Sequence, residues 1–154
     1  MLSVANRLAQ LGIVLPDTAS PIANYVPFTR SGRTVYVSGQ LSKGAEGDVR
    51  GVVGVDVTRE QAVHGARLCG INLLCQLRAA CGGNLDRVTR ILKLGGFVQA
   101  GPMFDAVPAI VDGASDLMVA AFGDRGRHAR SAVGVFRLPL GYAVEIDAIA
   151  EIAA

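Results

Sequence analysis

The chain has 154 residues, which is enough for one domain with one hydrophobic core, and we predict that residues 1–154 form a single domain. It is 51% hydrophobic and 18% charged, whereas about 25% charged residues is typical, so we expect some apolar surface to be buried against copies of the chain. The formal net charge of only +2 gives no reason to expect binding to nucleic acid or to an anionic membrane.

Residues 1–20 are expected to form an N-terminal helix and an extended arm. Apolar residues recur at helical spacing in residues 1–16, at Val4, Leu8, Leu11 and Leu15. Arg7 interrupts them, which is not typical of a signal peptide, and no apolar run approaches the roughly 20 residues that span a bilayer. Three prolines predict that the arm continues, extended and irregular, over residues 16–28.

The central part of the chain predicts a strand followed by a helix. In residues 33–41 apolar and polar positions alternate, as in a half-buried strand, and Gly39 is expected to end it. Thr58 and Gln61 have the spacing of a capping box, and an apolar stripe then continues over residues 62–80 until two glycines end the helix. Three cysteines in this helix point to different faces, which suits neither a disulfide nor a metal site: Cys69, Cys75 and Cys81. We expect reduced thiols and a cytoplasmic protein.

The C-terminal half predicts strand, helix, strand and strand. Residues 85–98 predict a strand, in which Gly95–Gly96 indicates a bulge. Residues 103–123 predict a helix that Pro108 and Gly113 split in two. Residues 127–152 predict two strands joined by a tight connection. In the last strand, apolar residues form one face and Glu145, Asp147 and Glu151 form the other.

These elements predict an α+β fold in which two helices cover one face of a sheet. The opposite face of such a sheet needs a partner, and on a small apolar chain this favours a closed oligomer.

Motifs of several enzyme classes are absent from the sequence. No G-x-G-x-x-G, P-loop, G-x-S-x-G or H-E-x-x-H occurs, and we predict no metal site, because His64 has no second ligand within reach. His128 lies two residues before Arg130 and is close enough in sequence to reach the same site. The loop "DRGRHAR" contains three arginines that could contact RNA phosphates, but the chain is only 5% aromatic, so nucleic-acid binding is not favoured.

Four stretches resemble one protein family. "ARSAVGVFRLPLGYAVEIDAIAEI" at residues 129–152 resembles the signature of the RidA/YjgF family, also called the L-PSP endoribonuclease family. "VYVSGQL" at 35–41 resembles its second hallmark, "NYVPF" occupies the place of its proline–tyrosine segment, and "GGNLDRVTRI" resembles its helix-to-strand junction. The resemblance runs from about residue 22 to the end. The chain is identified as a longer, divergent branch with an extra N-terminal helix.

This resemblance implies a chorismate-mutase-like α+β subunit that assembles as a homotrimer. A small carboxylate ligand would bind in clefts at the subunit interfaces. The implied activity is that of an enamine/imine deaminase, which hydrolyses reactive enamines and imines of amino acids to 2-oxo acids and ammonia without a cofactor.

The resemblance also implies roles for individual residues. Arg130 would bind the ligand carboxylate through its planar guanidinium, Glu145 would orient the attacking water, and Tyr25 would close the cleft as a lid. The remaining candidate substrate-binding residues are Ser38, Gly39, Ser115, Ser131 and Ala132.

Three positions depart from the deaminase pattern. Gly134 stands where the deaminases have a glutamate, Ala132 where several have a cysteine, and Ser115 where an asparagine is typical. The first two favour an alternative, a protein that binds a 2-oxo acid or amino acid without turnover. A third alternative is an endoribonuclease or translation inhibitor, which only the "DRGRHAR" loop supports.

Overall fold

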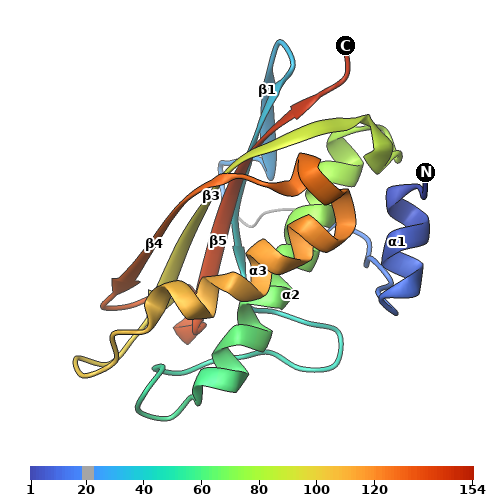
Figure 1. The fold of residues 1–154 in the computed structure, drawn as a ribbon. Helices are drawn as coiled ribbons and strands as arrows, with labels where there is room; N and C mark the ends of the chain where they lie inside the picture. The colour runs from blue at the N-terminus through green and yellow to red at the C-terminus, as the bar shows by residue number, and fades with distance from the viewer. Residues whose placement is uncertain (19–22) are drawn as a thin grey trace.

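A computed structural model describes residues 1–18 and 23–154 of the chain. Its elements in chain order are α1 (Val4–Gln10), β1 (Phe28–Ser31), β2 (Thr34–Leu41), α2 (Arg59–Ala80), η1 (Leu85–Arg87), β3 (Val88–Gln99), α3 (Val107–Phe122), η2 (Gly123–Gly126), β4 (Ala129–Val135), η3 (Pro139–Gly141) and β5 (Val144–Ile152). Figure 1 shows α1 as a separate short helix beside the turn that leads into β3.

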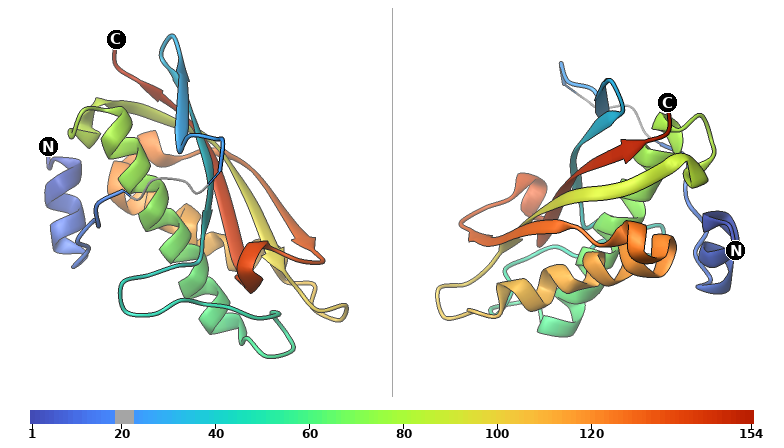
Figure 2. Two further views of the ribbon diagram at one scale, coloured as in Figure 1. Left: turned by 180° about the vertical axis from the view of Figure 1, so that it is seen from behind. Right: turned by 45° about the horizontal axis from the view of Figure 1, so that its top comes forward.

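Within the described residues, five strands form one mixed sheet in the order β1-β2-β5-β3-β4. Neighbouring strands are antiparallel except β3 and β4, which are parallel. Helices α2 and α3 pack on the same face of the sheet, as Figures 1 and 2 show from three directions. The expected α+β architecture, with two helices covering one face of a mixed sheet, is therefore confirmed. We call the opposite side, which carries Glu145 and Asp147, the open face.

The hydrophobic core lies between the sheet and these two helices. Strand β5 alternates as its sequence predicts, and its buried residues are Val144, Ile146, Ala148, Ala150 and Ile152. The residues between them point to the open face and are half-buried. The period of two therefore directs the carboxylates of β5 away from the core.

Helix α2 begins with the predicted capping box. Thr58 Oγ1 accepts a hydrogen bond from the Gln61 backbone N–H at 3.1 Å, and Gln61 Oε1 accepts one from the Thr58 N–H at 2.8 Å. These bonds satisfy amide groups that have no partner within the helix. The three cysteines are free and buried, as expected.

Helix α3 is continuous, so the predicted break at Pro108 and Gly113 is wrong. Pro108 lies in the first turn, where its missing N–H leaves no intrahelical bond unmade. A methyl group on Gly113 would collide with the backbone carbonyl of Val63 in α2. This glycine therefore permits close contact between two helices.

The predicted bulge at Gly95–Gly96 is also wrong. The register shifts of β3 lie nearer its start, between Val88 and Arg90 and between Ile91 and Lys93. Both glycines pair regularly with neighbouring strands, and a methyl group on Gly96 would stand 2.6 Å from Val111 Cγ2 of α3. These glycines allow close packing.

Other boundaries differ from the expectations. Strand β2 does not end at Gly39 but continues to Leu41, with a register shift between Val37 and Gln40. A further strand that the sequence did not predict, β1, begins at Phe28, the last residue of the expected arm. Helix α1 ends at Gln10, earlier than expected. The expected arm is described only in part, because residues 19–22 lie outside the described residues.

The last two strands do not form a hairpin. Strand β4 pairs with β3 in parallel, and β5 pairs with the other edge of β3, so β3 lies between them. The tight connection predicted between β4 and β5 is wrong, because residues 136–143 must cross the end of β3.

Candidate functional site

Glu145 lies on the open face, against the backbone of β2. A methyl group on Gly39 would stand 2.5 Å from Glu145 Oε2. Burial, and then the neighbouring charge of Asp147, raise the pKa of Glu145 above its ordinary value of 4.5. A carboxyl group with a raised pKa is a stronger base than an ordinary glutamate, which favours a role in accepting a proton.

Asp147 is the next residue on the same face of β5, and sequence reasoning assigned it no role. It pairs with Gly95 of β3, and a methyl group on that glycine would collide with its carboxylate. Burial raises the pKa of Asp147, while the backbone of Gly95 and the charge of Lys93 act in the opposite direction. Two half-buried carboxyl groups thus face the same way.

The segment that contains Tyr25 is fastened to β2 through Ser38. The Ser38 hydroxyl donates to the carbonyl of Val26 at 2.7 Å, and its backbone N–H donates to the carbonyl of Pro27 at 2.9 Å. Tyr25 itself is 55% exposed. Three candidates, Ser38, Gly39 and Glu145, therefore lie together, with Tyr25 on an adjoining segment.

Arg130 of β4 faces the helices instead. It pairs with Leu94, whose side chain is fully buried beneath them, and paired residues project to the same side of a sheet. Its Nη1 donates to Asp112 Oδ1 at 2.7 Å and to Ser115 Oγ at 3.2 Å. The Arg130 side chain is 23% exposed and that of Asp112 is 55% exposed.

His128 belongs to the same group, which sequence reasoning left open. Its Nε2 lies 2.9 Å from Ser115 Oγ, and its Nδ1 lies 2.6 Å from the carbonyl oxygen of Gly126. We call Arg130, Ser115, His128 and Asp112 the β4–α3 cluster. Asp112 was missed because the helix was predicted to break beside it.

The other candidates on β4 divide between the two faces. Ala132 pairs with Gly96 and packs against the core, on the same side as Arg130. Ser131 pairs with Gly95 and faces the open side. Gly134 has room for a side chain, because a methyl group there would meet Val107 Cγ2 at 3.7 Å, an ordinary contact.

The candidate residues therefore form two groups on opposite faces of one subunit. Glu145, Gly39 and Ser38 lie on the open face, and Arg130 and Ser115 lie on the helix side. The expected convergence of Arg130 and Glu145 does not occur within one chain. Surface hollows of about 660 Å³ beside α1 and about 180 Å³ at the end of α2 are lined by other residues.

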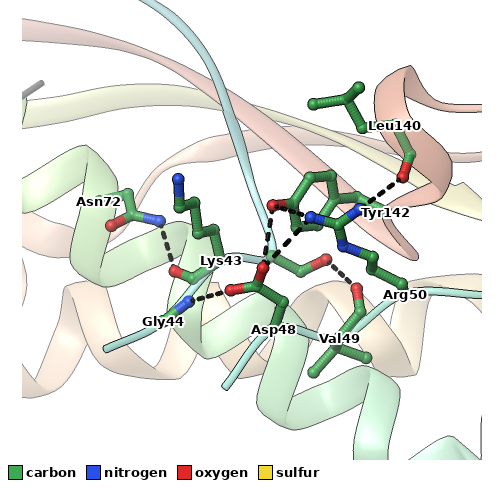
Figure 3. Close-up of polar contacts among 9 residues, drawn as sticks. Lys43, Gly44, Asp48, Val49, Arg50, Asn72, Leu140 and Tyr142 are labelled. Atoms are coloured by element: carbon green, nitrogen blue, oxygen red, sulfur yellow. Dashed lines mark hydrogen bonds and ion pairs between the residues drawn. The ribbon is translucent and has the colours of Figure 1, made fainter. Parts of the chain in front are cut away.

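A polar network connects the loop after β2 to Tyr142, just before the start of β5 (Figure 3). Asp48 Oδ2 accepts from the Tyr142 hydroxyl at 3.0 Å, and the Arg50 guanidinium stacks 4.4 Å above the Tyr142 ring. Burial acts to raise the pKa of Asp48, but hydrogen bonds from Tyr142, Gly44 and Arg50 together lower it. Burial and then the Asp48 contact raise the pKa of Tyr142. The network holds residues 48–50 against Tyr142, which lies two residues before β5.

The arginine-rich loop is occupied by internal contacts. Arg125 Nη1 donates to the carbonyl oxygens of Val88 at 2.6 Å and Asp86 at 3.3 Å. Arg127 pairs with Asp124 at 3.3 Å. Part of the donor capacity of this loop is therefore used within the chain, although the Arg127 side chain is 70% exposed.

Membrane-spanning helices and groups of metal-binding side chains are both absent from the described part of the chain. None of its helices is long and apolar enough to cross a membrane. In residues 1–18 and 23–154, no group of three or more His, Cys, Asp or Glu side chains is arranged to hold a metal ion.

Comparison with known proteins gives consistent matches over almost the whole chain. The family model described as "YjgF/chorismate mutase-like, putative endoribonuclease" matches residues 5–152. Protein TCP17 of Trypanosoma cruzi is 45% identical over 151 residues, which cover 97% of this chain and 94% of that protein.

Two crystal structures are similar in fold and sequence. Atu1372 of Agrobacterium tumefaciens, a protein described as having unknown function, matches with a TM-score of 0.91 and 46% identity over 97% of this chain and 92% of its own. A protein of Shewanella oneidensis MR-1, described as a "putative endoribonuclease", matches with a TM-score of 0.93 and 31% identity over 98% of this chain and 100% of its own.

Proposed function

This chain belongs to the YjgF/chorismate mutase-like family, and from that premise we propose that it is an enamine/imine deaminase. It hydrolyses reactive 2-imino and enamine acids to 2-oxo acids and ammonia. It acts without a cofactor, in the cytoplasm.

The observation that carries this proposal is the way Arg130 is held. Among the described residues, both hydrogen bonds of its guanidinium come from Nη1, to Asp112 and Ser115. The edge formed by Nε and Nη2 then remains for a ligand. Two parallel N–H donors on this edge match the two oxygens of a carboxylate, which every 2-imino acid carries.

The reaction adds water to C2 of the imine and then expels ammonia. Glu145 orients the water and passes one of its protons to the imine nitrogen as the C–O bond forms. As the C–N bond breaks, it passes the remaining hydroxyl proton to the departing ammonia while the carbonyl forms. The balance is one imino acid and one water to one 2-oxo acid and one ammonia. The raised pKa of Glu145 suits both proton transfers, since such a group takes up and releases protons closer to neutral pH.

The site is completed by a second copy of the chain in a homotrimer. Arg130 and Glu145 lie on opposite faces of one sheet, so the open face of one subunit must meet the β4–α3 cluster of its neighbour. Exposed apolar side chains support this assembly, with Tyr36, Val133 and Phe136 exposed by 49%, 46% and 81%. Tyr25 closes the shared cleft, and Ser131, Ala132 and Gly39 line it.

The direct test generates 2-aminoacrylate with a serine dehydratase and follows its decay with and without the protein. We expect wild type to accelerate the decay, and Arg130→Ala to lose most of that acceleration. Arg59→Ala, which removes an exposed arginine at the start of α2, is the matched control and should behave as wild type. Equal decay with wild type and Arg130→Ala would contradict the proposed role.

A second function uses the same cleft to bind a small carboxylate without turnover. Gly134 supports it, because this position carries no side chain where the deaminases have a glutamate. Thermal-shift measurements with pyruvate and 2-oxobutyrate separate the two functions. Stabilisation by these ligands without hydrolysis of 2-aminoacrylate would favour binding alone.

Ribonuclease activity is the remaining alternative, and the hydrogen bonds that Arg125 donates to two backbone carbonyls speak against it. RNA degradation by nuclease-free protein, compared with the double variant Arg125→Ala and Arg127→Ala, tests it directly. Degradation that disappears in the double variant would restore this alternative.

A further inference from the structure

A continuous chain of hydrogen bonds connects a buried backbone carbonyl to the guanidinium of Arg130. It runs from the Gly126 oxygen to His128 Nδ1 (2.6 Å), from His128 Nε2 to Ser115 Oγ (2.9 Å), and from Ser115 Oγ to Arg130 Nη1 (3.2 Å). Asp112 contacts the same Nη1 at 2.7 Å. His128, Ser115 and Arg130 are each partly buried.

The chemistry of the partners sets the direction of the two end bonds, and the tautomer of His128 with its proton on Nδ1 then sets the middle one. A carbonyl oxygen only accepts, so Nδ1 of His128 carries the proton and donates to Gly126. The tautomer with its proton on Nδ1 presents Nε2 as an acceptor for the Ser115 hydroxyl. A guanidinium only donates, so the Ser115 oxygen accepts from Arg130 while its own proton points to His128. Each link therefore joins one donor to one acceptor.

The first member of the chain is rigidly placed. Gly126 is buried, and a methyl group on it would collide with the backbone of Met118 in α3. The carbonyl that holds His128 is thus fixed by packing between η2 and α3. A fixed end makes the whole chain a means of orienting Arg130.

We propose that His128 is a positioning residue, which acts through Ser115 to hold the Nε–Nη2 edge of Arg130 toward the ligand carboxylate. The identity of that ligand rests on the proposed function. Asp112 and Ser115 together occupy both N–H groups of Nη1, so the guanidinium can rotate only by breaking one of these bonds. An arginine that is ordered before the ligand arrives loses less conformational freedom on binding.

Two substitutions of His128 separate positioning from general structural support. His128→Leu keeps an apolar body of similar size but removes the acceptor for Ser115. His128→Gln keeps an oxygen that reaches the same hydroxyl. Binding of 2-oxobutyrate and of the neutral 2-oxobutanamide is measured by calorimetry, and KM and kcat are measured for 2-aminoacrylate.

In His128→Leu we expect the Kd for 2-oxobutyrate to rise about three- to tenfold, with the Kd for the amide nearly unchanged. KM should rise more than kcat falls, and His128→Gln should recover most of the lost affinity. In a Ser115→Ala background, His128→Leu should add little, since His128 acts through Ser115. Unchanged carboxylate affinity in His128→Leu, or equal losses for both ligands, would overturn the proposal.

Crystal structures of wild type and His128→Leu keep this test separate from the proposed function. If wild type neither binds 2-oxobutyrate nor hydrolyses 2-aminoacrylate, the proposed function fails. The position of Arg130 in the two crystals still decides the inference. Departure of Arg130 from Asp112 and Ser115 in His128→Leu supports it, and an unmoved Arg130 overturns it.

Discussion

The carboxylate of Glu145 rests directly on the backbone of Gly39. A methyl group on Gly39 would stand 2.5 Å from Oε2 of Glu145 and 2.8 Å from its carboxyl carbon. Only a residue without a side chain allows this approach, at a point where the pairing of β2 with β5 is irregular. The position of the proposed water-orienting group therefore depends on the neighbouring strand.

We expect Gly39→Ala to impair catalysis more than stability. The new methyl group must displace the carboxylate of Glu145, which is the flexible end of its side chain. The free energy of unfolding should therefore fall by less than about 1 kcal/mol, while kcat for 2-aminoacrylate falls about tenfold or more. Gly134→Ala is the matched control, because its methyl group has room, and should leave both quantities nearly unchanged. Full activity in Gly39→Ala would contradict this prediction.

Glu145→Gln is expected to stabilise the protein at neutral pH. Because the folded pKa of Glu145 is raised, the folded state retains this proton to higher pH than the unfolded chain does. Stability is then lost as pH rises from 4.5 through the folded pKa, and the loss persists at pH 7.5. Glutamine has no proton to lose.

Thermal unfolding from pH 3.5 to 8 tests this expectation. The Tm of Glu145→Gln should exceed that of wild type at pH 7.5, and the difference should shrink below pH 4.5. A variant that is less stable than wild type at pH 7.5 would show that the charged carboxylate is favoured in the folded protein.

Asp147→Asn should shift the acid limb of the pH profile of kcat/KM to lower pH. The charge of Asp147 is the second cause of the raised pKa of Glu145, after burial, so its removal lowers that pKa without abolishing the shift. Glu151→Gln is the control, because Glu151 lies farther along the same face and contacts Arg33 and Thr89. If the acid limb does not move in Asp147→Asn, the charge of Asp147 does not raise the pKa of Glu145.

Asp112→Asn should strengthen binding of carboxylates. Asparagine keeps an oxygen that accepts from Arg130 Nη1, but it removes a negative charge that competes with the ligand. We expect the Kd for 2-oxobutyrate to fall about two- to fivefold at low salt, and less at high salt.

Asp112→Ala should weaken binding instead, because it removes the acceptor as well. Asp116→Asn changes an exposed carboxylate one turn along α3 and should have little effect. Calorimetry at two salt concentrations measures all three variants. Weaker binding in Asp112→Asn would indicate that the charge of Asp112 is needed to hold Arg130.

Mixing two inactive variants should restore activity if the site is shared between subunits. Homotrimers of Arg130→Ala lack the carboxylate anchor at every site, and homotrimers of Glu145→Ala lack the water-orienting group. After unfolding and refolding a 1:1 mixture, about a quarter of the sites contain both intact residues, so about a quarter of wild-type activity should return. No recovery, with mixed trimers demonstrated by mass spectrometry, would contradict a site that is shared between subunits.

Local patterns determined much of this protein. The period of two in β5 correctly placed Glu145 and Asp147 opposite the core, since alternation is a property of the strand itself. The capping box at Thr58 and Gln61 correctly marked the start of α2, because its partners are three residues apart. The motifs at residues 35–41 and 129–152 led to the correct family.

Features that depend on contacts between residues distant in the sequence were decided only by the tertiary structure. Pro108 and Gly113 suggest a broken helix until α2 is present, and Gly95–Gly96 suggests a bulge until Asp147 and Val111 fill the space beside it. Arg130 and Glu145 are 15 positions apart in one motif, yet they face opposite sides because Arg130 pairs with Leu94 of β3 and Glu145 pairs with Phe97, which point to opposite faces of the sheet. Strand order is set by long-range pairing, which a local pattern does not contain. The contacts of Arg130 with Asp112 and Ser115, and of Ser115 with His128, depend on the pairing of β4 with β3 and on the position of α3 beside β4.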